Sequence, residues 1–394
     1  MYLRIQILLW LRKGKMAMLS VCIITKNEEK NIRRCLASLL GYGFELVVVD
    51  TGSTDGTREV VREFTDKLYQ FEWCDDFAAA KNFAISKAEH DLVLVVDSDE
   101  FLEPITDDNL KKLEQLICQN PDGIGRIRRK NIFVRDGIRQ ENREWINRIF
   151  DRRKFHYQGR IHEQVESRED GQRQGKEAKT WLSPLTFLHT GYDLSPEEKE
   201  RKAKRNIDLL EKELSHVTAK LEGLCAREKT IEAAELEAQI PYLLYQLGKS
   251  YYMAGNNTQA CEYFDKGLGF DLNPKLEYVI DMVETYGYAL LNSGQEQAAL
   301  SFENIYQEFG TSADFQFLMG LIYMKNARFH QAIAEFEKAL SQSDCRSVGV
   351  NSYAANYNIG VIYECLGHIE LANGYYQKCG NYEPAKKRLR LIAG

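Results

Sequence analysis

The sequence of 394 residues lacks a long apolar run and an excess of positive charge. Its first residues, MYLRIQILLWL, are apolar but too few to cross a bilayer, and positive charges follow this run instead of preceding it as in a signal peptide. We interpret residues 1–17 as an N-terminal extension; the alternative is a short interfacial anchor that makes a peripheral membrane contact. The net charge of -6 argues against a general nucleic-acid binder, so we expect no nucleic acid as a partner.

Cysteine shows neither a metal-binding nor a disulfide pattern. The nine cysteines are an odd number, and the sequence contains no CxxC pair and no Cys/His spacing of a zinc site. Several lie inside apolar runs, as Cys22 does. We therefore expect reduced, mostly buried thiols in a cytoplasmic protein, with membrane association as the alternative.

The N-terminal half alternates strand-like and helix-like segments. Short apolar runs rich in Val and Ile lie at residues 19–25, 45–50 and 92–97. A weaker candidate strand lies at residues 67–71. These runs lack period-2 alternation, so both faces should be buried, as in a parallel sheet covered by helices. Helix-like segments between them lie at residues 28–40, 55–64 and 77–88. The order predicts an open, doubly wound α/β sheet, which short strands and loops in residues 100–190 complete.

A set of small and aromatic positions repeats from residue 241 onward. Three copies share the same internal offsets and a fourth is degenerate; they begin at Gly248, Gly320, Gly360 and, for the degenerate copy, Gly287. The spacings of 39, 33 and 40 residues lie near the ~34 of tetratricopeptide helix pairs. We predict an all-α tetratricopeptide-repeat domain over residues 241–394. Residues 195–198 (SPEE) predict a helix start, which opens a helical linker over residues 193–240.

Polar clusters follow three of the predicted strands, at residues 25–29, 50–57 and 97–100. Parallel α/β sheets bind ligands at the carboxyl ends of their strands, so these clusters are candidate site residues. The alternative for any one cluster is a helix cap or a turn, which uses the same residue types. Three neighbouring acidic clusters favour a bound cation or ligand, because like charge is otherwise costly to gather.

Asp97 and Asp99 form a DxD motif at the end of an apolar strand. Residues two apart in an extended segment point the same way, so both carboxylates can face one cation. Hard oxygen ligands suit Mg²⁺ or Mn²⁺, and such an ion can neutralise a departing nucleoside diphosphate. The alternative is a solvated acidic turn.

The sequence then resembles a known family. Residues 18–103 (SVCIITKNEE…VVVDTGSTDGT…FAAAKNFAI…LVLVVDSDEFL), with 155–163 (FHYQGRIHE) and 188–192 (LHTGY), resemble family 2 glycosyltransferases of the GT-A fold. With its repeats, the chain is similar to the subgroup that includes peptide S-glycosyltransferases and relatives of lipopolysaccharide-core transferases. The resemblance implies a Rossmann-like, mostly parallel α/β GT-A catalytic domain over residues 18–192.

The resemblance also implies roles for individual residues. Asp50 would contact the base, Lys81 and Asn82 the diphosphate, and Asp97 the ribose. The whole implied nucleotide-sugar pocket is Thr25, Asn27, Glu28, Asp50, Ser53, Asp55, Lys81, Asn82 and Asp97. The implied metal ligands, for Mn²⁺ or Mg²⁺, are Asp97, Asp99, His162 and His189. The implied general base is Glu163, with Glu100 as the alternative. Basic residues that would meet phosphate or acceptor, or else form a solvated basic face, are Arg148, Arg152 and Arg153.

We therefore predict a metal-dependent, inverting glycosyltransferase of the hexosyltransferase type with a UDP-linked donor. The expected acceptor is a peptide, a protein or a saccharide, with polysaccharide or lipopolysaccharide synthesis as the alternative. The repeats would recruit a macromolecular acceptor or form a homodimer. A nucleotidyltransferase is a rival, but it would show a glycine-rich loop where Lys26-Asn27-Glu28-Glu29 stands. The rival from another class is a scaffold protein with an inert transferase domain.

Overall fold

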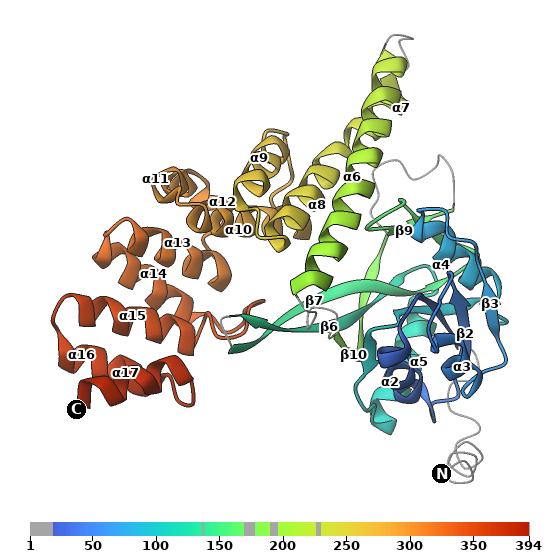
Figure 1. Cartoon of the computed structure of the whole chain (residues 1–394), viewed down its shortest axis with the longest axis horizontal. Helices are drawn as coiled ribbons and strands as arrows, with labels where there is room; N and C mark the ends of the chain where they lie inside the picture. Colours follow the sequence, from blue (N-terminus) through green and yellow to red (C-terminus); the bar gives the residue numbers. More distant parts are fainter. Residues whose placement is uncertain (1–18, 136–137, 169–177, 190–195, 226–229, 394) are drawn as a thin grey trace. The chain divides into compact units, whose positions relative to one another are not determined.

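The computed structural model describes residues 19–135, 138–168, 178–189, 196–225 and 230–393. The chain divides into two compact units, Met1–Leu194 and Ser195–Gly394, which we describe separately (Figure 1). The boundary lies close to the predicted end of the α/β domain at residue 192. The predicted extension over residues 1–17 lies outside the described residues.

An eight-stranded sheet organises the N-terminal unit, in the order β3-β2-β1-β4-β7-β6-β10-β5. Its first four strands in this order are parallel neighbours: β3 (Leu68–Gln70), β2 (Glu45–Asp50), β1 (Leu19–Thr25) and β4 (Leu92–Asp97). The three principal strands have the bounds predicted from their apolar runs, which confirms those predictions. The chain moves outward from β1 through β2 to β3 and then returns to the other side of β1 with β4, so the sheet order reverses between β1 and β4.

Apolar side chains on both faces of these strands explain why the runs do not alternate. Val21 and Ile23 belong to a core with helix α2 (Glu29–Leu39), whereas Cys22 belongs to a second core with helix α4 (Phe77–Ser86). The other helices of this unit are α3 (Thr57–Arg62) and α5 (Asp107–Gln119). A sheet buried on both sides leaves its strand ends as the natural place for polar chemistry.

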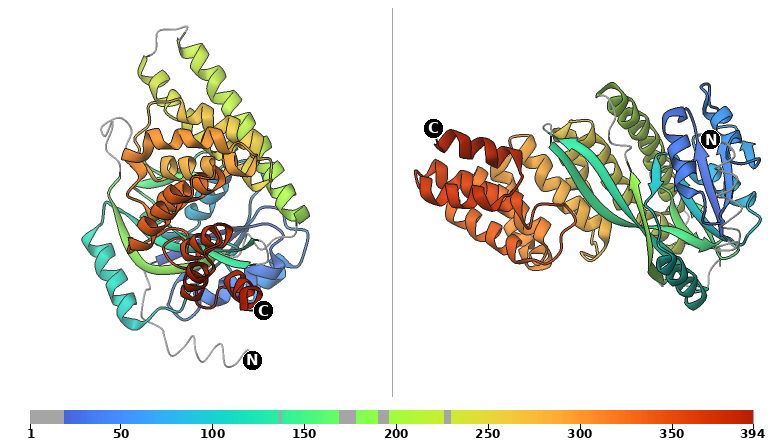
Figure 2. Two further views of the ribbon diagram at one scale, coloured as in Figure 1. Left: turned by 90° about the vertical axis from the view of Figure 1, so that its left-hand side faces the viewer. Right: turned by 90° about the horizontal axis from the view of Figure 1, so that it is seen from below.

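The second half of the sheet differs from the expectation of short strands. Strands β6 (Ile124–Arg135) and β7 (Ile138–Asp151) form a long antiparallel ribbon that extends beyond the other strands in Figures 1 and 2. Charged residues face each other across the ribbon, as Arg129 faces Glu144, so this part of the segment is a paired ladder and not a set of short strands and loops. The remaining strands are β5 (Glu100–Leu102), β10 (Thr180–His189) and the separate pair β8 (Phe155–Gln158) and β9 (Gln164–Ser167).

Helical hairpins build the C-terminal unit, as the repeat pattern predicts. The three regular copies are the pairs α8 (Ile240–Met253) with α9 (Asn257–Leu268), α13 (Ala313–Lys325) with α14 (Phe329–Ser341), and α15 (Tyr353–Cys365) with α16 (Ile369–Lys378). In the degenerate copy, α10 (Glu277–Asn292) precedes three short pieces: α11 (Glu296–Ala299), η1 (Leu300–Ile305) and α12 (Tyr306–Phe309). Helix α17 (Glu383–Ala393) follows α16.

The predicted linker is part of this helical unit. Helix α6 (Pro196–Cys225) contacts α7 (Thr230–Glu237) and α8, and Tyr251 on α8 donates a hydrogen bond from its hydroxyl to Glu211 Oε1 on α6 at 2.9 Å. The predicted cap residue Ser195 lies outside the described residues. Helix α6 therefore packs on the first repeat as an additional helix. The sequence analysis had predicted a helical linker separate from the repeats.

Each regular repeat places a glycine against an aromatic ring. A Cβ atom on Gly320 would lie 2.5 Å from Phe336, whereas a Cβ atom on Gly374 of α16 would meet nothing within 4 Å. We expect Gly320→Ala to lower the free energy of unfolding by about 1–3 kcal/mol, because the helices cannot then approach. Gly374→Ala should raise it by up to about 1 kcal/mol through helix propensity. Urea denaturation of both variants checks this, and equal effects would contradict the packing argument.

Two expectations from composition can be compared with the structure. None of the helices in the described ranges combines the length and the hydropathy needed to span a lipid bilayer. The cysteines whose side chains are described are free, but only half of the eight are fully buried: Cys22, Cys35, Cys261 and Cys379. The expectation of mostly buried thiols is therefore wrong for the exposed residues Cys74, Cys118 and Cys365.

Candidate active site

The parallel register brings the three predicted clusters to one edge of the sheet. Thr25 at the end of β1 is level with Asp50 on β2, and Ile24 is level with Asp97 on β4. The backbone N–H of Thr51 donates to the carbonyl of Thr25 at 2.9 Å, which ties the first two clusters together. The edge where sheet order reverses between β1 and β4 is therefore the polar edge, as the fold predicts.

The first two clusters form interlocked turns. Asp50 is buried, and its carboxylate accepts hydrogen bonds from the backbone N–H groups of Gly52 (3.2 Å) and Ser53 (3.1 Å). Ser53 Oγ in turn accepts from the backbone N–H of Asn27 at 2.9 Å, and Asn27 Oδ1 accepts from Thr54 N at 2.8 Å. Asn27 has a positive φ of 54°, which Asn tolerates better than most residues. These contacts set the shape of the edge.

Asp55 and Glu28 lie directly before the first turns of helices α3 and α2. Asp55 Oδ1 accepts from the backbone N–H of Thr57 at 3.1 Å, and burial, which raises the pKa of Asp55, is outweighed by hydrogen bonds from Thr57, so that pKa is lowered. Glu28 Oε2 accepts from Asn31 Nδ2 at 2.8 Å in the first turn of α2. Asp55 thus makes a capping contact with a backbone N–H, the alternative that the sequence left open, whereas the side chain of Glu28 makes no capping hydrogen bond.

Thr25 has a buried hydroxyl whose oxygen makes no hydrogen bond within the described part of the chain. A buried hydroxyl without a partner costs about 1–3 kcal/mol, so its presence at this edge needs a reason. A ligand that donates to or accepts from Thr25 Oγ1 would remove this cost. The hydroxyl is therefore the feature of the first cluster that most directly indicates a ligand.

Asp97 lies between two buried cations. Its Oδ1 is 3.0 Å from Lys81 Nζ on α4, and its Oδ2 is 2.5 Å from Arg148 Nη2 on β7. Burial alone would raise the pKa of Asp97, but Arg148 and Lys81 hold it well below its usual range. Lys81 Nζ also contacts Glu163 Oε1 at 2.6 Å, so one ammonium group joins Asp97 to the turn between β8 and β9. The structure therefore brings together Lys81, Asp97 and Glu163, to which the sequence analysis assigned separate roles.

Glu100 is fully buried, with an exposed fraction of 0%. Its Oε1 accepts from Arg129 at 3.1 Å and from Arg148 at 3.2 Å, and its Oε2 accepts from the backbone N–H of Asp97 at 3.1 Å. A general base must reach the proton that it removes. Glu100 is closed off from any acceptor in this structure, so its geometry fits an anchor for Arg148 and argues against the alternative base.

Asn82 and Glu163 shape the neighbouring turn. Asn82 Nδ2 donates to the carbonyl of Tyr157 at 2.8 Å and Asn82 Oδ1 accepts from the N–H of Tyr157 at 2.9 Å, so both amide atoms fix β8. The side chain of Glu163 retains 13% exposure beside Lys81. Asn82 therefore positions β8, whereas Glu163 keeps access to solvent.

Asp99 faces His189 at the far side of the DxD motif. Asp99 Oδ2 is 3.3 Å from His189 Nε2, and His189 Nδ1 is 2.7 Å from Asn131 Oδ1. Carboxylate oxygen and imidazole nitrogen suit Mn²⁺, and Mg²⁺ also binds through one or two protein ligands with substrate phosphates. Asp99 and His189 therefore fit a divalent cation that takes its other ligands from donor and water.

A complete protein ligand set is not preassembled. Within the described ranges, no group of three or more His, Cys, Asp or Glu side chains lies close enough to hold a metal ion. Asp97, a predicted ligand, is engaged by Lys81 and Arg148. His162 occupies the β8–β9 turn with a positive φ of 53°, and is not part of such a group with Asp99 and His189. Of the two predicted histidines, His189 is the one that the structure places against Asp99.

The predicted basic residues have different surroundings. Arg148 is buried in the site, whereas Arg152 donates to the carbonyls of Ile85 and Ala88, and Arg153 pairs with Asp151 on the surface. The sequence interpretation missed Arg129, Asn131 and Glu144, which lie on β6 and β7. The only signal for them was a charged alternation, and it is weak without knowledge of the strand pairing.

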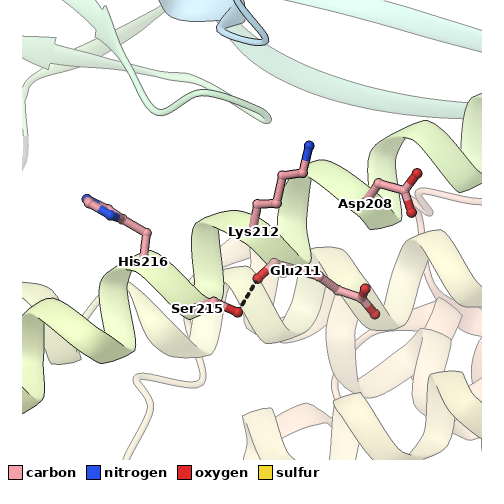
Figure 3. A pocket seen from close by; sticks show the side chains of 5 residues that line it. All are labelled: Asp208, Glu211, Lys212, Ser215 and His216. Atoms are coloured by element: carbon pink, nitrogen blue, oxygen red, sulfur yellow. Dashed lines mark hydrogen bonds between the residues drawn. The ribbon is translucent and has the colours of Figure 1, made fainter.

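A shallow pocket in the helical unit is unrelated to these residues. Figure 3 shows it, with Ser215 Oγ bonded to the carbonyl of Glu211 at 2.8 Å. Its lining residues all belong to α6: Asp208, Glu211, Lys212, Ser215 and His216. It contains no predicted site residue.

Comparisons with known proteins agree with both units. Residues 20–167 match the family model described as Glycosyl transferase family 2, and residues 242–266 and 313–343 match tetratricopeptide repeat models. The repeat matches fall on the α8–α9 and α13–α14 hairpins.

Among curated proteins, the chain is similar to the SPbeta prophage-derived glycosyltransferase SunS of Bacillus subtilis, with 24% identity over 62% of this chain and 52% of SunS. It is also similar to the lipopolysaccharide core biosynthesis glycosyltransferase LpsC of Rhizobium meliloti, with 32% identity over 37% of this chain and 56% of LpsC. The chain thus spans about half the length of these relatives.

Among solved structures, S. aureus TarS aligns with 16% identity and a TM-score of 0.35, over 73% of this chain and 55% of TarS. A TM-score this low supports no statement about ligands. The family model, the two relatives and the sheet order are sufficient for the assignment of the fold. The N-terminal unit is a GT-A-type domain of glycosyl transferase family 2, carried in one chain with tetratricopeptide repeats.

Proposed function

We propose that the N-terminal unit transfers a hexose from a UDP-linked donor to an acceptor, with inversion at the anomeric carbon. The observation that carries this proposal is the DxD motif, in which Asp97 contacts Lys81 and Arg148 while Asp99 faces His189. The positive side chains Lys81 and Arg148, beside the carboxylate–imidazole pair Asp99 and His189, suit a substrate that carries a negatively charged diphosphate. The family 2 domain and the two glycosyltransferase relatives support the reaction class.

Asp99 and His189 would hold the divalent cation, Mn²⁺ or Mg²⁺. Bound there, the cation would supply electrostatic stabilisation of the leaving diphosphate. Lys81 would add a second positive group from the protein side. Its ammonium is already desolvated and oriented by Asp97 and Glu163, so it needs little reorganisation to stabilise developing negative charge.

Glu163 is the proposed general base. Its carboxylate is held beside Lys81 at 2.6 Å and keeps partial exposure, which Glu100 does not. In the proposed step Glu163 takes the proton of the acceptor hydroxyl or thiol as that atom forms its bond to the anomeric carbon. The bond from the anomeric carbon to the diphosphate breaks at the same time, and the electron pair leaves with the diphosphate.

The proposed acceptor is a peptide or protein that the repeats help to recruit. Stacked helix hairpins suit an extended macromolecular ligand better than a free sugar. A saccharide acceptor of polysaccharide or lipopolysaccharide synthesis is the second candidate, favoured by the similarity to LpsC. The two candidate acceptors require the same donor chemistry and differ in what the helical unit contacts. The alternatives to acceptor recruitment are that the repeats form a dimer, or that the protein is a scaffold with an inert transferase domain.

One experiment tests the proposal at the level of the donor. The protein is incubated with UDP-hexoses, with and without Mn²⁺, and UDP release and glycosylated products are measured with a peptide pool and a saccharide pool. We expect UDP release that needs the cation, and a glycosylated peptide. Release without any cation would contradict the metal role, and transfer only to saccharides would move the acceptor to the second candidate. Absence of release with every donor would support the inert scaffold.

The nucleotide pocket provides a prediction on binding. Asp50→Ala should weaken UDP binding by about 1.5–3 kcal/mol, the scale of a hydrogen bond to a charged group. Because Asp50 also holds the turn at Gly52 and Ser53, Thr25→Val is the cleaner variant. It removes a hydroxyl that makes no internal hydrogen bond in the described ranges, so stability should stay level while UDP binding weakens by about 0.5–1.5 kcal/mol. Isothermal calorimetry measures the UDP dissociation constant of both variants. Dissociation constants equal to that of the wild type would show that Asp50 and Thr25 do not belong to the pocket.

A further inference from the structure

The aromatic ring of Tyr157 faces the ammonium group of Lys81 in the candidate active site. Lys81 Nζ lies 5.3 Å from the centre of the Tyr157 ring, within the ~6 Å over which a cation is attracted to an aromatic face. Both side chains are buried, and this attraction is stronger where water is excluded. The hydroxyl of Tyr157 makes no hydrogen bond in the described part of the chain, so the contact with Lys81 is made by the ring.

Asn82 on helix α4 fixes the backbone of strand β8 at Tyr157. The Asn82 amide accepts from the N–H of Tyr157 at 2.9 Å and donates to its carbonyl at 2.8 Å, as a neighbouring strand would. The orientation of this amide is unambiguous, because the N–H needs an acceptor and the carbonyl needs a donor. The ring of Phe150 on β7 packs edge-on against the Tyr157 ring, with the ring centres 5.7 Å apart. Tyr157 is therefore held through both its backbone and its ring.

The ring of Tyr157 differs in kind from the other groups that hold Lys81. The Lys81 ammonium also contacts Asp97 Oδ1 at 3.0 Å and Glu163 Oε1 at 2.6 Å. Both carboxylates belong to the part of the site that donor and acceptor would enter, so their hold on Lys81 changes when substrates bind. The Tyr157 ring is uncharged and takes no part in the proposed reaction. Its hold on Lys81 therefore persists while donor and acceptor occupy the site.

We propose that Tyr157, fixed by Asn82, is a positioning residue whose ring keeps the ammonium of Lys81 in place for the leaving diphosphate. The proposal rests on the proposed function, in which Lys81 stabilises that diphosphate. Negative charge on the diphosphate grows as its bond to the sugar breaks, so a displaced Lys81 slows this step more than it weakens donor binding. Neither Tyr157 nor Asn82 needs to touch the donor for this role.

The kinetic test compares Tyr157→Leu with Tyr157→Phe in the full chain, by UDP release from a UDP-hexose in Mn²⁺. Leucine removes the ring, so kcat should fall by about 5–30-fold while the donor KM changes much less. Phenylalanine keeps the ring and removes only the hydroxyl, so it should restore most of the kcat that Tyr157→Leu loses. A loss in Tyr157→Phe as large as that in Tyr157→Leu would overturn the role of the ring.

Phe155→Leu is the matched control on the same strand. Phe155 is buried on β8 and also packs edge-on against Phe150, with the ring centres 6.3 Å apart, whereas Lys81 lies over the ring of Tyr157. Phe155→Leu should therefore lower the midpoint of thermal unfolding, as Tyr157→Leu does, but leave kcat near the wild-type value. Equal losses of kcat in the two leucine variants would indicate a packing effect and overturn the positioning role.

The Lys81→Met background tests whether Tyr157 acts through Lys81. In this background Tyr157→Leu should cause little further loss of kcat and a smaller drop in the thermal midpoint than in the wild type, because the contact is already lost. Equal drops in both backgrounds would overturn the contact. A wild type that releases no UDP from any UDP-hexose, or full turnover of Lys81→Met, would instead contradict the proposed function and remove the purpose assigned to Tyr157, while the thermal comparison still decides the contact itself.

Discussion

Replacing Asp99 by Asn should reduce sugar transfer by a factor of about 10²–10³ or more while the fold stays intact. The reason is that Asn keeps the size of Asp but removes the charge that would hold a cation beside His189, and electrostatic groups aimed at a transition state contribute on this scale. Stability should hold or rise slightly, because the negative charge of Asp99 lies among the other carboxylates of the site. Donor turnover in Mn²⁺, with circular dichroism and urea denaturation, measures both effects.

Asp108→Asn is the matched control for Asp99→Asn. Asp108 lies exposed in the first turn of α5, and its replacement makes the same chemical change outside the DxD motif. It should leave turnover unchanged and cost at most about 1 kcal/mol of stability through the helix dipole. Near-wild-type turnover of Asp99→Asn, or full activity of the wild-type protein in excess EDTA, would contradict the proposed role of Asp99 in binding a metal ion.

Arg148→Met should lower the free energy of unfolding by about 3–5 kcal/mol, the usual cost of leaving buried charges without their partner. Arg148 is buried between Asp97 and Glu100, and Glu100 is itself fully buried, so the carboxylate of Glu100 cannot turn to water. Urea denaturation at neutral pH measures the loss. Catalysis should fall as well, because Asp97 would then be held by Lys81 alone.

Arg153→Met removes the same type of side chain from the surface. Arg153 pairs with Asp151 and Asp91 and is mostly exposed, so its loss should cost at most about 1 kcal/mol. The double variant Arg148→Met/Glu100→Gln should recover part of the loss, because the neutral amide that replaces the Glu100 carboxylate leaves no charge stranded. Equal effects of the two arginine variants would contradict the buried network.

The same network gives the wild-type protein a defined response to acid. The folded-state pKa of Asp97 lies well below its usual value, so the stability that Asp97 contributes is present above the ordinary Asp range. It is lost as pH falls through the lowered folded-state pKa. Arg148→Met removes the first cause of that shift, so its stability should depend less steeply on pH on the acid side.

The polar edge of the sheet could be predicted from the sequence because each strand and the acidic residues at its end are neighbours along the chain. An apolar run followed at once by acidic residues fixes both the strand and the position of the acids at its end, as for β2 with Asp50 and β4 with Asp97. The parallel register then follows from the order of the elements. The offsets of the repeats are local too, so the α13–α14 hairpin could be placed from Gly320 and Phe336 alone.

The sequence could not predict the partners that decide each role. Arg148 binds Asp97 because β7 pairs with β4, and Asn131 meets His189 because β10 pairs with β6; neither pairing is visible in one sequence. Glu100 shows the consequence most plainly. Its position after the DxD motif suggested a catalytic acid or base, yet the arginines that close around it come from strands far along the chain.

The strand pairing also sets when these groups can meet during folding. Glu100 is level with His189, since β5 pairs only with β10 in the described sheet, and this contact joins residues that are distant along the chain. The hairpins of the helical unit instead close within one repeat, as α8 does on α9. Contacts between distant residues form slowly, because the intervening loop must first be closed. During synthesis, Glu100 on β5 must therefore wait for β10 at the end of the N-terminal unit before it reaches its buried place in the sheet.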